Sequence, residues 1–306
     1  MYIFAMSSQQ KPFLKWVGGK TQIIDKILSK VPSEFENYHE PFLGGGSVLL
    51  AILSLQKQNL ITIKGKIYAY DINQSLINVF THVQREKTEL YKQIGIIVKE
   101  YDSIKNDKRD KGDNPPMNID EAKTSKENYY YWIRTRYNTS EKNTIESSAM
   151  FMFLNKTCFR GMYREGPKGF NVPFGHYKKT PTIITETDIA KISDLIKNVE
   201  FIHCDFRDAI KNVKSGDFVY LDPPYAPENR SSFVGYVANG FDIDMHKQLF
   251  SDIKKMDTGI KFVMSNAKVA LVTDTFSEYN CEEFVARRAI NAKKPDSTTT
   301  EVIIYN

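Results

Sequence analysis

Short apolar runs and amphipathic segments alternate near both ends of the chain. The apolar run Phe218–Leu221 predicts a buried strand, and the spacing of Ile23, Ile24 and Ile27 predicts a helix. Further strands are predicted at 68–70, 199–206 and 259–267, and a further helix at 189–197. This alternation is typical of an α/β fold.

The middle of the chain follows a different pattern. Helical but polar sequence extends from 73 to 138, and residues 102–128 contain almost no apolar positions, which predicts a solvated loop there. The three consecutive tyrosines at 129–131 are followed by Arg134 and Arg136. Such an aromatic stripe most often packs into a core, although rings and guanidinium groups can also contact sugar and phosphate.

A basic β-hairpin is predicted between 158 and 177, with its turn at 165–169. It follows an apolar helix that ends near Asn155. Hairpins that carry arginine can enter the major groove of DNA; the alternative is a solvated basic ribbon. The charge balance between 150 and 180 favours DNA, because Glu165 is the one acid among six basic residues: Lys156, Arg160, Arg164, Lys168, Lys178 and Lys179.

Two polar loops interrupt the last part of the chain. The segment 226–241 is rich in Gly, Ser and Asn and is long enough to close over a site. The segment 287–300 is basic and rich in Ser and Thr, and we expect it to join two strands of a closing hairpin.

Composition sets limits on the class of protein. With 306 residues and 41% hydrophobic content, the chain can form one large domain or two. The sequence contains no run of 18 apolar residues, so no membrane span is predicted. The N-terminus does not resemble a secretory signal. Three widely spaced cysteines suggest an intracellular, reducing compartment. A net charge of +5 is too small to identify a nucleic-acid partner.

An acid, two prolines and a tyrosine follow the strand at 218–221. Pro223 and Pro224 fix φ and remove two backbone donors, so neither a central strand nor a helix can continue past Asp222. Ligands of open α/β sheets bind at this carboxyl end of the strands. A carboxylate and a proline carbonyl can accept the two N–H bonds of an exocyclic amino group on a flat heteroaromatic base. The ring of Tyr225 could stack on the face of that base. The alternative is a structural turn with Asp222 exposed.

Glycines mark two other turns. Gly18 and Gly19 follow Trp16, and three glycines at 44–46 precede an apolar helical run, where backbone can approach a ligand closely. The pattern is neither the dinucleotide-binding motif nor a P-loop. Asp71 ends the next strand, where nucleotide-binding folds hold a ribose hydroxyl. It could equally cap the helix that follows.

Six segments resemble the DNA adenine N6-methyltransferases of the Dam and DpnM type; in chain order they are KWVGGK, EPFLGGG, YAYDIN, FLNKTCFRGMYR, FNVPFGHYK and DPPY. The resemblance extends from about residue 11 to the C-terminus. It implies an α/β fold with a seven-stranded, Rossmann-like class I methyltransferase sheet and a helical target-recognition insertion that carries a β-hairpin. The implied domains are a catalytic domain of residues 1–77 and 180–306 and a DNA-binding domain of residues 78–179.

The resemblance also implies S-adenosyl-L-methionine as the cofactor. Residues expected to contact it are Trp16, Lys20, Phe42, Gly44, Gly46, Asp71, Asp205, Phe206 and Asp222. The catalytic loop would consist of Asp222, Pro223, Pro224 and Tyr225. The target adenine would flip out of the duplex and stack on Tyr225, with N6 held by Asp222 and the Pro223 carbonyl. No metal and no cysteine nucleophile are expected.

The same resemblance implies double-stranded DNA as the partner and GATC as the target. The expected DNA-binding residues are Asn155, Lys156, Arg160, Met162, Arg164, Pro173, Lys178 and Lys179. The family more often has Asn where this chain has Arg160, and arginine commonly reads guanine. A cognate restriction endonuclease is a further candidate partner, and a monomer or weak dimer is expected. N4-cytosine methylation, an inactive DNA-binding relative and a nucleotide-dependent oxidoreductase remain as alternatives.

Overall fold

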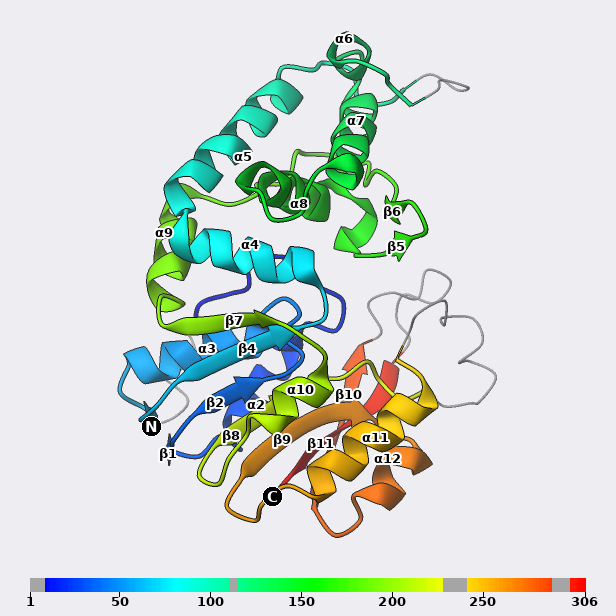
Figure 1. The fold of residues 1–306 in the computed structure, drawn as a ribbon. Helices are drawn as coiled ribbons and strands as arrows, with labels where there is room; N and C mark the ends of the chain where they lie inside the picture. The colour runs from blue at the N-terminus through cyan, green and yellow to red at the C-terminus, as the bar shows by residue number, and fades with distance from the viewer. Residues whose placement is uncertain (1–8, 110–114, 228–240, 288–297) are drawn as a thin grey trace.

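The protein is described by a computed structural model that covers residues 9–109, 115–227, 241–287 and 298–306. A central sheet lies between helices, and a second group of helices lies beyond one of its edges (Figure 1). Within the described residues the sheet has seven strands in the order β10-β11-β9-β8-β2-β4-β7. The strands are β2 (Tyr38–Glu40), β4 (Ile67–Asp71), β7 (Val199–His203), β8 (Phe218–Leu221), β9 (Lys261–Ala267), β10 (Asn280–Arg287) and β11 (Thr298–Tyr305).

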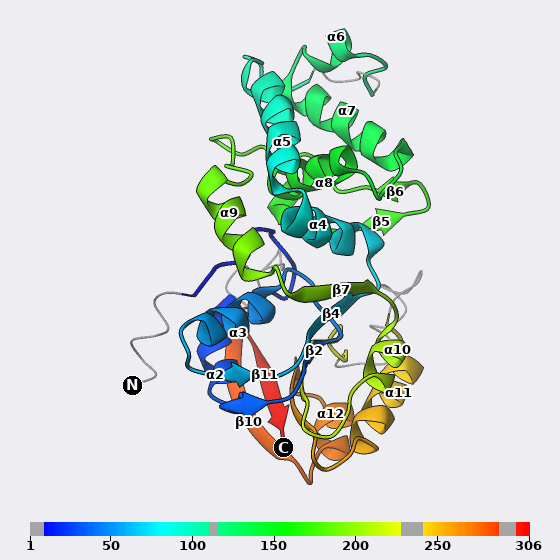
Figure 2. The same cartoon turned by 60° about the vertical axis from the view of Figure 1, so that its left-hand side comes forward.

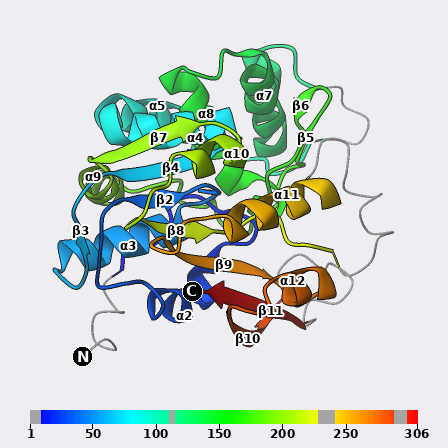
Figure 3. The ribbon, with the colours of Figure 1, turned by 60° about the horizontal axis from the view of Figure 1, so that its bottom comes forward.

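The five strands from β9 to β7 are parallel, and β11 runs antiparallel to both of its neighbours. Figure 3 shows β9 between β8 and β11, with β10 at the outer edge. Strand β8 is buried at all four positions, as expected for a central strand of a parallel sheet that is covered on both faces. The expected seven-stranded α/β fold is therefore confirmed.

Helices cover both faces of the sheet. Helices α2 (Ile24–Leu28) and α3 (Ser47–Lys57) lie on one side, and α10 (Phe206–Lys211), α11 (Ile243–Lys254) and α12 (Ala270–Thr275) lie on the other (Figure 2). A short 3-10 helix, η2 (Lys20–Gln22), precedes α2. Strands β1 (Glu34–Phe35) and β3 (Thr62–Ile63) form a small parallel pair. No helix in the described ranges has both the length and the apolar content that a bilayer crossing requires.

The chain leaves the sheet after β4 and returns to it at β7. The segment between them contains α4 (Gln74–Arg85), α5 (Lys87–Asp102), α6 (Ile119–Ala122), α7 (Lys126–Thr139), α8 (Ile145–Thr157), η3 (Phe159–Gly161), β5 (Glu165–Gly166), β6 (Gly169–Phe170) and α9 (Glu186–Leu195). Polar side chains cap most of its helices: Asn73 accepts from the Leu76 N–H, for example, and Ser125 accepts from the Asn128 N–H. Nearly every residue of α8 is buried, so this helix forms the centre of the helical group.

Most expected elements of this segment are present. The hairpin is confirmed, although β5 and β6 have only two residues each, and a single bridge between Cys158 and Phe174 extends the pairing. Tyr129 and Tyr130 are buried in the core, as their position on a helix predicts.

The expectation of an uninterrupted loop at 102–128 is partly wrong. Helix α6 forms there because the Asn118 side chain accepts from the Glu121 N–H and caps a single turn, and α7 already begins at Lys126. The predicted closing loop at 226–241 and the basic loop at 287–300 lie mostly outside the described residues.

Candidate active site

Asp222 lies at the carboxyl end of β8, next to a buried lysine. Its Oδ2 is 2.6 Å from the Nζ of Lys20, a residue that is only 4% exposed. The Lys20 backbone N–H donates to Ser47 Oγ at 3.2 Å, and Ser47 directly follows Gly46. Lys20 thus joins the acidic end of β8 to the glycine loop at the start of α3.

The second carboxylate oxygen of Asp222 has a different environment. Oδ1 is buried and has no hydrogen-bond partner in the part of the chain that the structure describes. Burial raises the pKa of the Asp222 carboxyl, while the positive charge of Lys20 opposes that shift. The structure therefore holds an acceptor without a donor at the end of a central strand, and such groups are uncommon in folded proteins.

Tyr225 is held from two sides. Its hydroxyl donates to Glu301 Oε2 at 2.9 Å, from β11. The Lys20 ammonium lies 5.0 Å from the centroid of its ring. Because Lys20 also binds Asp222, one cation contacts both the acid and the ring of the loop.

Two further side chains fix the backbone of this loop. His246 Nε2, from α11, lies 2.9 Å from the Pro224 carbonyl oxygen. Asn266 Oδ1, near the end of β9, accepts from the Ala226 N–H at 3.0 Å. Glu301, His246 and Asn266 were not predicted from the sequence, and no local signal could have identified them, since each is more than 20 residues from the loop.

The glycine loop has the backbone geometry that its sequence predicts. Gly44 and Gly46 have φ values of +49° and +69°, in the left-handed region that favours glycine. A Cβ atom on Gly44 would lie 2.9 Å from Trp16 Cδ1. Asp71 Oδ2 accepts from the Gly44 N–H at 2.9 Å, so the end of β4 holds the loop in place.

The suggestion that Asp71 caps the following helix is wrong. Asn73 caps α4, and Asp71 Oδ1 instead accepts from the Asn73 N–H at 2.9 Å. Burial raises the pKa of the Asp71 carboxyl, and the two backbone N–H bonds partly oppose this effect. Each oxygen of Asp71 therefore accepts one backbone hydrogen bond and retains capacity for another.

Three of the four remaining predicted cofactor residues, Trp16, Phe42 and Phe206, are aromatic, and the fourth is Asp205. Phe42 stacks on Phe206 with their centroids 5.7 Å apart. Asp205 caps α10 by accepting from the Arg207 N–H at 2.9 Å. Trp16 stacks on Tyr163 of the insertion at 5.3 Å. Phe42 follows the carboxyl end of β2, and Asp205 and Phe206 follow that of β7.

Glu40 is an acid of the site that the sequence analysis missed. It ends β2 and is only 2% exposed, and its Oε2 accepts from the Tyr38 hydroxyl at 2.6 Å. Burial raises its pKa to about 8, and the charges of Asp222 and Asp71 act in the same direction. Its position directly before Pro41, at the end of a strand beside β8, was the available signal.

Two predicted DNA-binding residues connect the insertion to the N-terminal segment. The amide of Asn155 is buried, and it accepts from the Lys15 N–H at 2.8 Å and donates to the Lys15 carbonyl at 2.7 Å. The Lys156 carbonyl accepts from Lys15 Nζ at 3.4 Å, and burial lowers the pKa of the Lys156 ammonium. Both residues therefore contact Lys15, and their contact with DNA stays a prediction.

The other predicted DNA-binding residues are more accessible. Arg160 is exposed and has a φ of +57°, whereas Met162 is half-buried against the core. Arg164 donates from Nε to Asn171 Oδ1 at 2.6 Å, across the hairpin. Pro173, Lys178 and Lys179 are exposed. A role of these residues in reading DNA stays a prediction.

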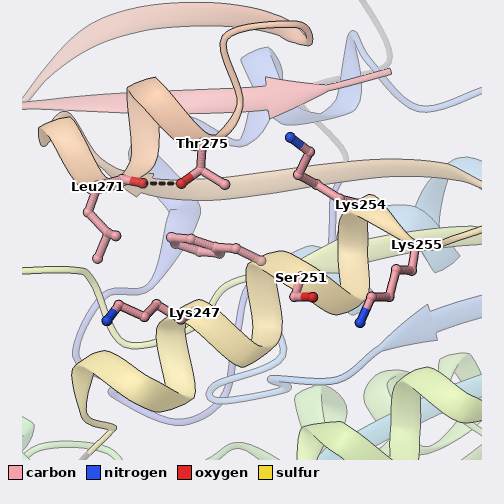
Figure 4. A pocket seen from close by; sticks show the side chains of 7 residues that line it. Lys247, Ser251, Lys254, Lys255, Leu271 and Thr275 are labelled. Carbon is pink, nitrogen blue, oxygen red and sulfur yellow. Dashed lines mark hydrogen bonds between the residues drawn. The ribbon is translucent and has the colours of Figure 1, made fainter.

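A pocket of 310 Å³ lies elsewhere, between α11 and α12 (Figure 4). It is lined by Lys247, Phe250, Ser251, Lys254, Lys255, Leu271 and Thr275, and it contains none of the predicted site residues. A second pocket of 540 Å³ between α10 and α11 contains none of them either. The candidate site is therefore defined by the convergent side chains at the strand ends, not by these hollows.

The sheet order and the Asp-Pro-Pro-Tyr loop at the end of its central strand define a Rossmann-like methyltransferase. The sequence profile of the D12 class N6 adenine-specific DNA methyltransferases matches residues 16–290, and the chain belongs to this family. It is an adenine-specific DNA methyltransferase.

Relatives from distant organisms match nearly the whole chain. The type II methyltransferase M.MjaIII of Methanocaldococcus jannaschii is 35% identical over 97% of this chain and 99% of its own. The type II methyltransferase M1.LlaDCHI of Lactococcus lactis subsp. cremoris is 30% identical over 97% of this chain and 95% of its own. The DNA adenine methylase of Haemophilus influenzae is 28% identical over 92% of this chain and 88% of its own.

Proposed function

We propose that this enzyme transfers a methyl group from S-adenosyl-L-methionine to N6 of an adenine flipped out of duplex DNA, within GATC. The observation that carries the proposal is the state of Asp222. One of its oxygens is bound to Lys20, and the other is a buried acceptor with no partner among the described residues. An exocyclic amino group supplies the donor that this oxygen lacks.

The residues at the strand ends fit the cofactor. Asp71 keeps acceptor capacity for ribose hydroxyls, and Gly44 and Gly46 allow close backbone approach. Trp16, Lys20, Phe42, Asp205 and Phe206 would complete the contacts. When bound, S-adenosyl-L-methionine supplies an electrophilic methyl group on a sulfonium centre.

The protein contributes positioning and electrostatics. Asp222 Oδ1 and the Pro223 carbonyl accept the two N6–H bonds and orient the amino nitrogen toward the methyl group. Tyr225 stacks on the base. The Lys20 ammonium favours the ionised form of Asp222, in which both carboxylate oxygens only accept hydrogen bonds. We therefore expect the ionised form of Asp222 to be the active one.

The helical segment with its hairpin, residues 78–179, would read the target. Met162, Arg164 and Pro173 would contact base edges in the major groove, and Arg160 would read a guanine or a phosphate. Asn155 and Lys156 would support this surface, while Lys178 and Lys179 would contact phosphates. The names of two relatives, both type II methyltransferases, favour a cognate restriction endonuclease as a cellular partner.

Replacement of Asp222 tests the chemistry. We expect Asp222→Ala to abolish methyl transfer, because the amino group loses its acceptor, while DNA binding is largely retained. Asp208→Ala is the matched control, since Asp208 is an exposed acid that pairs with Lys211. Near-normal turnover of Asp222→Ala would refute its role.

Sequencing of DNA from cells that express the enzyme tests the target. Methylated adenine confined to GATC supports the proposed specificity, whereas methylated adenine in another sequence refutes GATC alone. Methyl groups on cytosine N4 would refute the proposed acceptor base.

A further inference from the structure

Glu301 is the residue of the last strand that reaches the catalytic loop. It follows Thr300 in β11, where it pairs with Phe284 of β10 on one side and Ala267 of β9 on the other. Its carboxylate accepts from the Tyr225 hydroxyl at 2.9 Å. The two residues are separated by 76 positions in the sequence, so this contact exists only in the folded chain.

One face of the Tyr225 ring contacts a cation. The Lys20 ammonium lies over the ring, 5.0 Å from its centroid, and the same ammonium is 2.6 Å from Asp222 Oδ2. A cation over an aromatic ring is attracted by its negative face. Because Lys20 occupies that face, a base would have to stack on the opposite one.

Stacking requires that the ring hold one orientation. A tyrosine ring can turn about its side-chain torsions, and the terminal torsion is broad. The hydroxyl bond to Glu301 fixes the far end of the ring, while Lys20 contacts its face. A hydrogen bond to an ionised acceptor is stronger than one between neutral groups, so a carboxylate suits this task. Burial, together with the nearby charges of Asp222 and Glu301, raises the pKa of the Tyr225 phenol and keeps it a donor.

We propose that Glu301 is a positioning residue of the methyl transfer: it holds the Tyr225 ring so that one face meets Lys20 and the other receives the flipped adenine. The inference rests on the proposed function, because it assigns a purpose to the same ring. It adds a residue that lies outside the Asp-Pro-Pro-Tyr loop and acts only through Tyr225.

Four variants test this role in single-turnover reactions: Glu301→Ala, Glu301→Gln, Tyr225→Phe and the double variant Glu301→Ala/Tyr225→Phe. We expect Glu301→Ala to lower the rate of methyl transfer about tenfold, as for the loss of one hydrogen bond in the transition state. Glu301→Gln keeps an acceptor oxygen and should retain most of the rate. Tyr225→Phe should lower the rate little further in the Glu301→Ala background, because both changes remove the same bond.

A spectroscopic readout separates positioning from folding. Duplex DNA with 2-aminopurine at the target position reports how the flipped base stacks, and we expect brighter fluorescence with Glu301→Ala because the ring of Tyr225 holds the base less well. Cofactor affinity and the melting temperature should stay near the wild-type values. Glu283→Ala is the matched control, since Glu283 is an exposed acid of the same hairpin that pairs with Lys268.

Additive losses in the double variant, or unchanged fluorescence with a lower rate, would overturn the role of Glu301. A fall in melting temperature and cofactor affinity that accounts for the whole loss would also overturn it. The wild-type enzyme is measured first. If it transfers no methyl group to adenine, the proposed function fails; if it does and the losses are additive, the role of Glu301 alone fails.

Discussion

At the scale of single residues, three buried acids of the site differ in the groups that oppose the effect of burial on their pKa. Asp222, Asp71 and Glu40 follow or end neighbouring strands, and burial raises the pKa of each carboxyl. Lys20 opposes this effect at Asp222, and backbone N–H groups oppose it at Asp71. Glu40 accepts from the neutral hydroxyl of Tyr38, and burial raises its pKa to about 8, so it is mainly protonated at neutral pH.

The raised pKa of Glu40 predicts how the free energy of unfolding depends on pH. A carboxyl group has a pKa of 4.5 when it is unperturbed, and that of Glu40 is about 8 in the folded protein. Between these values the folded state binds more protons than the unfolded state, so the free energy of unfolding falls as pH rises from about 4.5 to about 8. Above that range both states are ionised and the full loss is present.

Glu40→Gln tests the prediction, because glutamine imitates the protonated acid and can still accept from Tyr38. We expect the variant to match the wild type near pH 5 and to exceed it above pH 8, by an amount on the order of a few kcal/mol. Urea unfolding at both pH values measures this difference. Two parallel stability curves would show that Glu40 titrates normally in the folded protein.

At the scale of elements, Arg164 directly precedes β5, in a hairpin whose ladder has only two residue pairs. The Arg164 side chain donates from Nε to Asn171 Oδ1 and from its terminal nitrogen to the Asn171 carbonyl at 3.3 Å, so one strand of the hairpin holds the guanidinium on the other. A guanidinium held in this way loses less freedom when it meets a base edge. The hairpin can therefore orient its arginine before DNA is bound.

We expect Arg164→Ala to cost about 1–3 kcal/mol and to relax discrimination at one position of the target. Methylation rates on duplexes with single base changes in GATC measure the effect. Lys168→Ala, in the exposed turn of the same hairpin, is the control and should leave discrimination unchanged. A loss of equal size on every duplex would identify Arg164 as a phosphate contact instead.

Elements whose signals are local were predictable from the sequence. The apolar run of β8, the prolines after it and the three glycines before α3 determine their own backbone geometry, and the structure has each of them where the sequence predicts it. Helix α6 was missed because one capped turn in a polar segment has no apolar periodicity.

The supports of the catalytic loop were not predictable for a different reason. Glu301, Asn266 and His246 come from β11, β9 and α11, and only the folded sheet with its covering helix brings them to one place. The burial of Asn155 was also unexpected. Its neighbours in the sequence are basic, which suggested DNA, whereas its amide bonds to the backbone of Lys15.

At the scale of the whole molecule, a small net charge is distributed unevenly. The chain carries a formal charge of +5, and the segment 150–180 has five more basic than acidic residues, six against one. Exposed lysines also occur at the end of α11, beside the pocket of Figure 4. Figures 1 and 2 show α11 beside the β8–β9 half of the sheet, whereas the helices of the insertion lie beyond β4 and β7.

This arrangement allows a test of which face meets the phosphate backbone. Each phosphate contact releases counterions. The logarithm of the binding constant therefore falls linearly with the logarithm of the salt concentration, with a slope of about 0.9 per contact. If Lys178 and Lys179 each contact a phosphate, the double change to glutamine should reduce that slope by about 1.8. The matched control is the double change Lys254→Gln/Lys255→Gln, which removes the same charge from α11. An equal reduction in both double variants would mean that long-range charge, not contact through this face, governs binding; an unchanged slope for Lys178 and Lys179 would remove them from the interface.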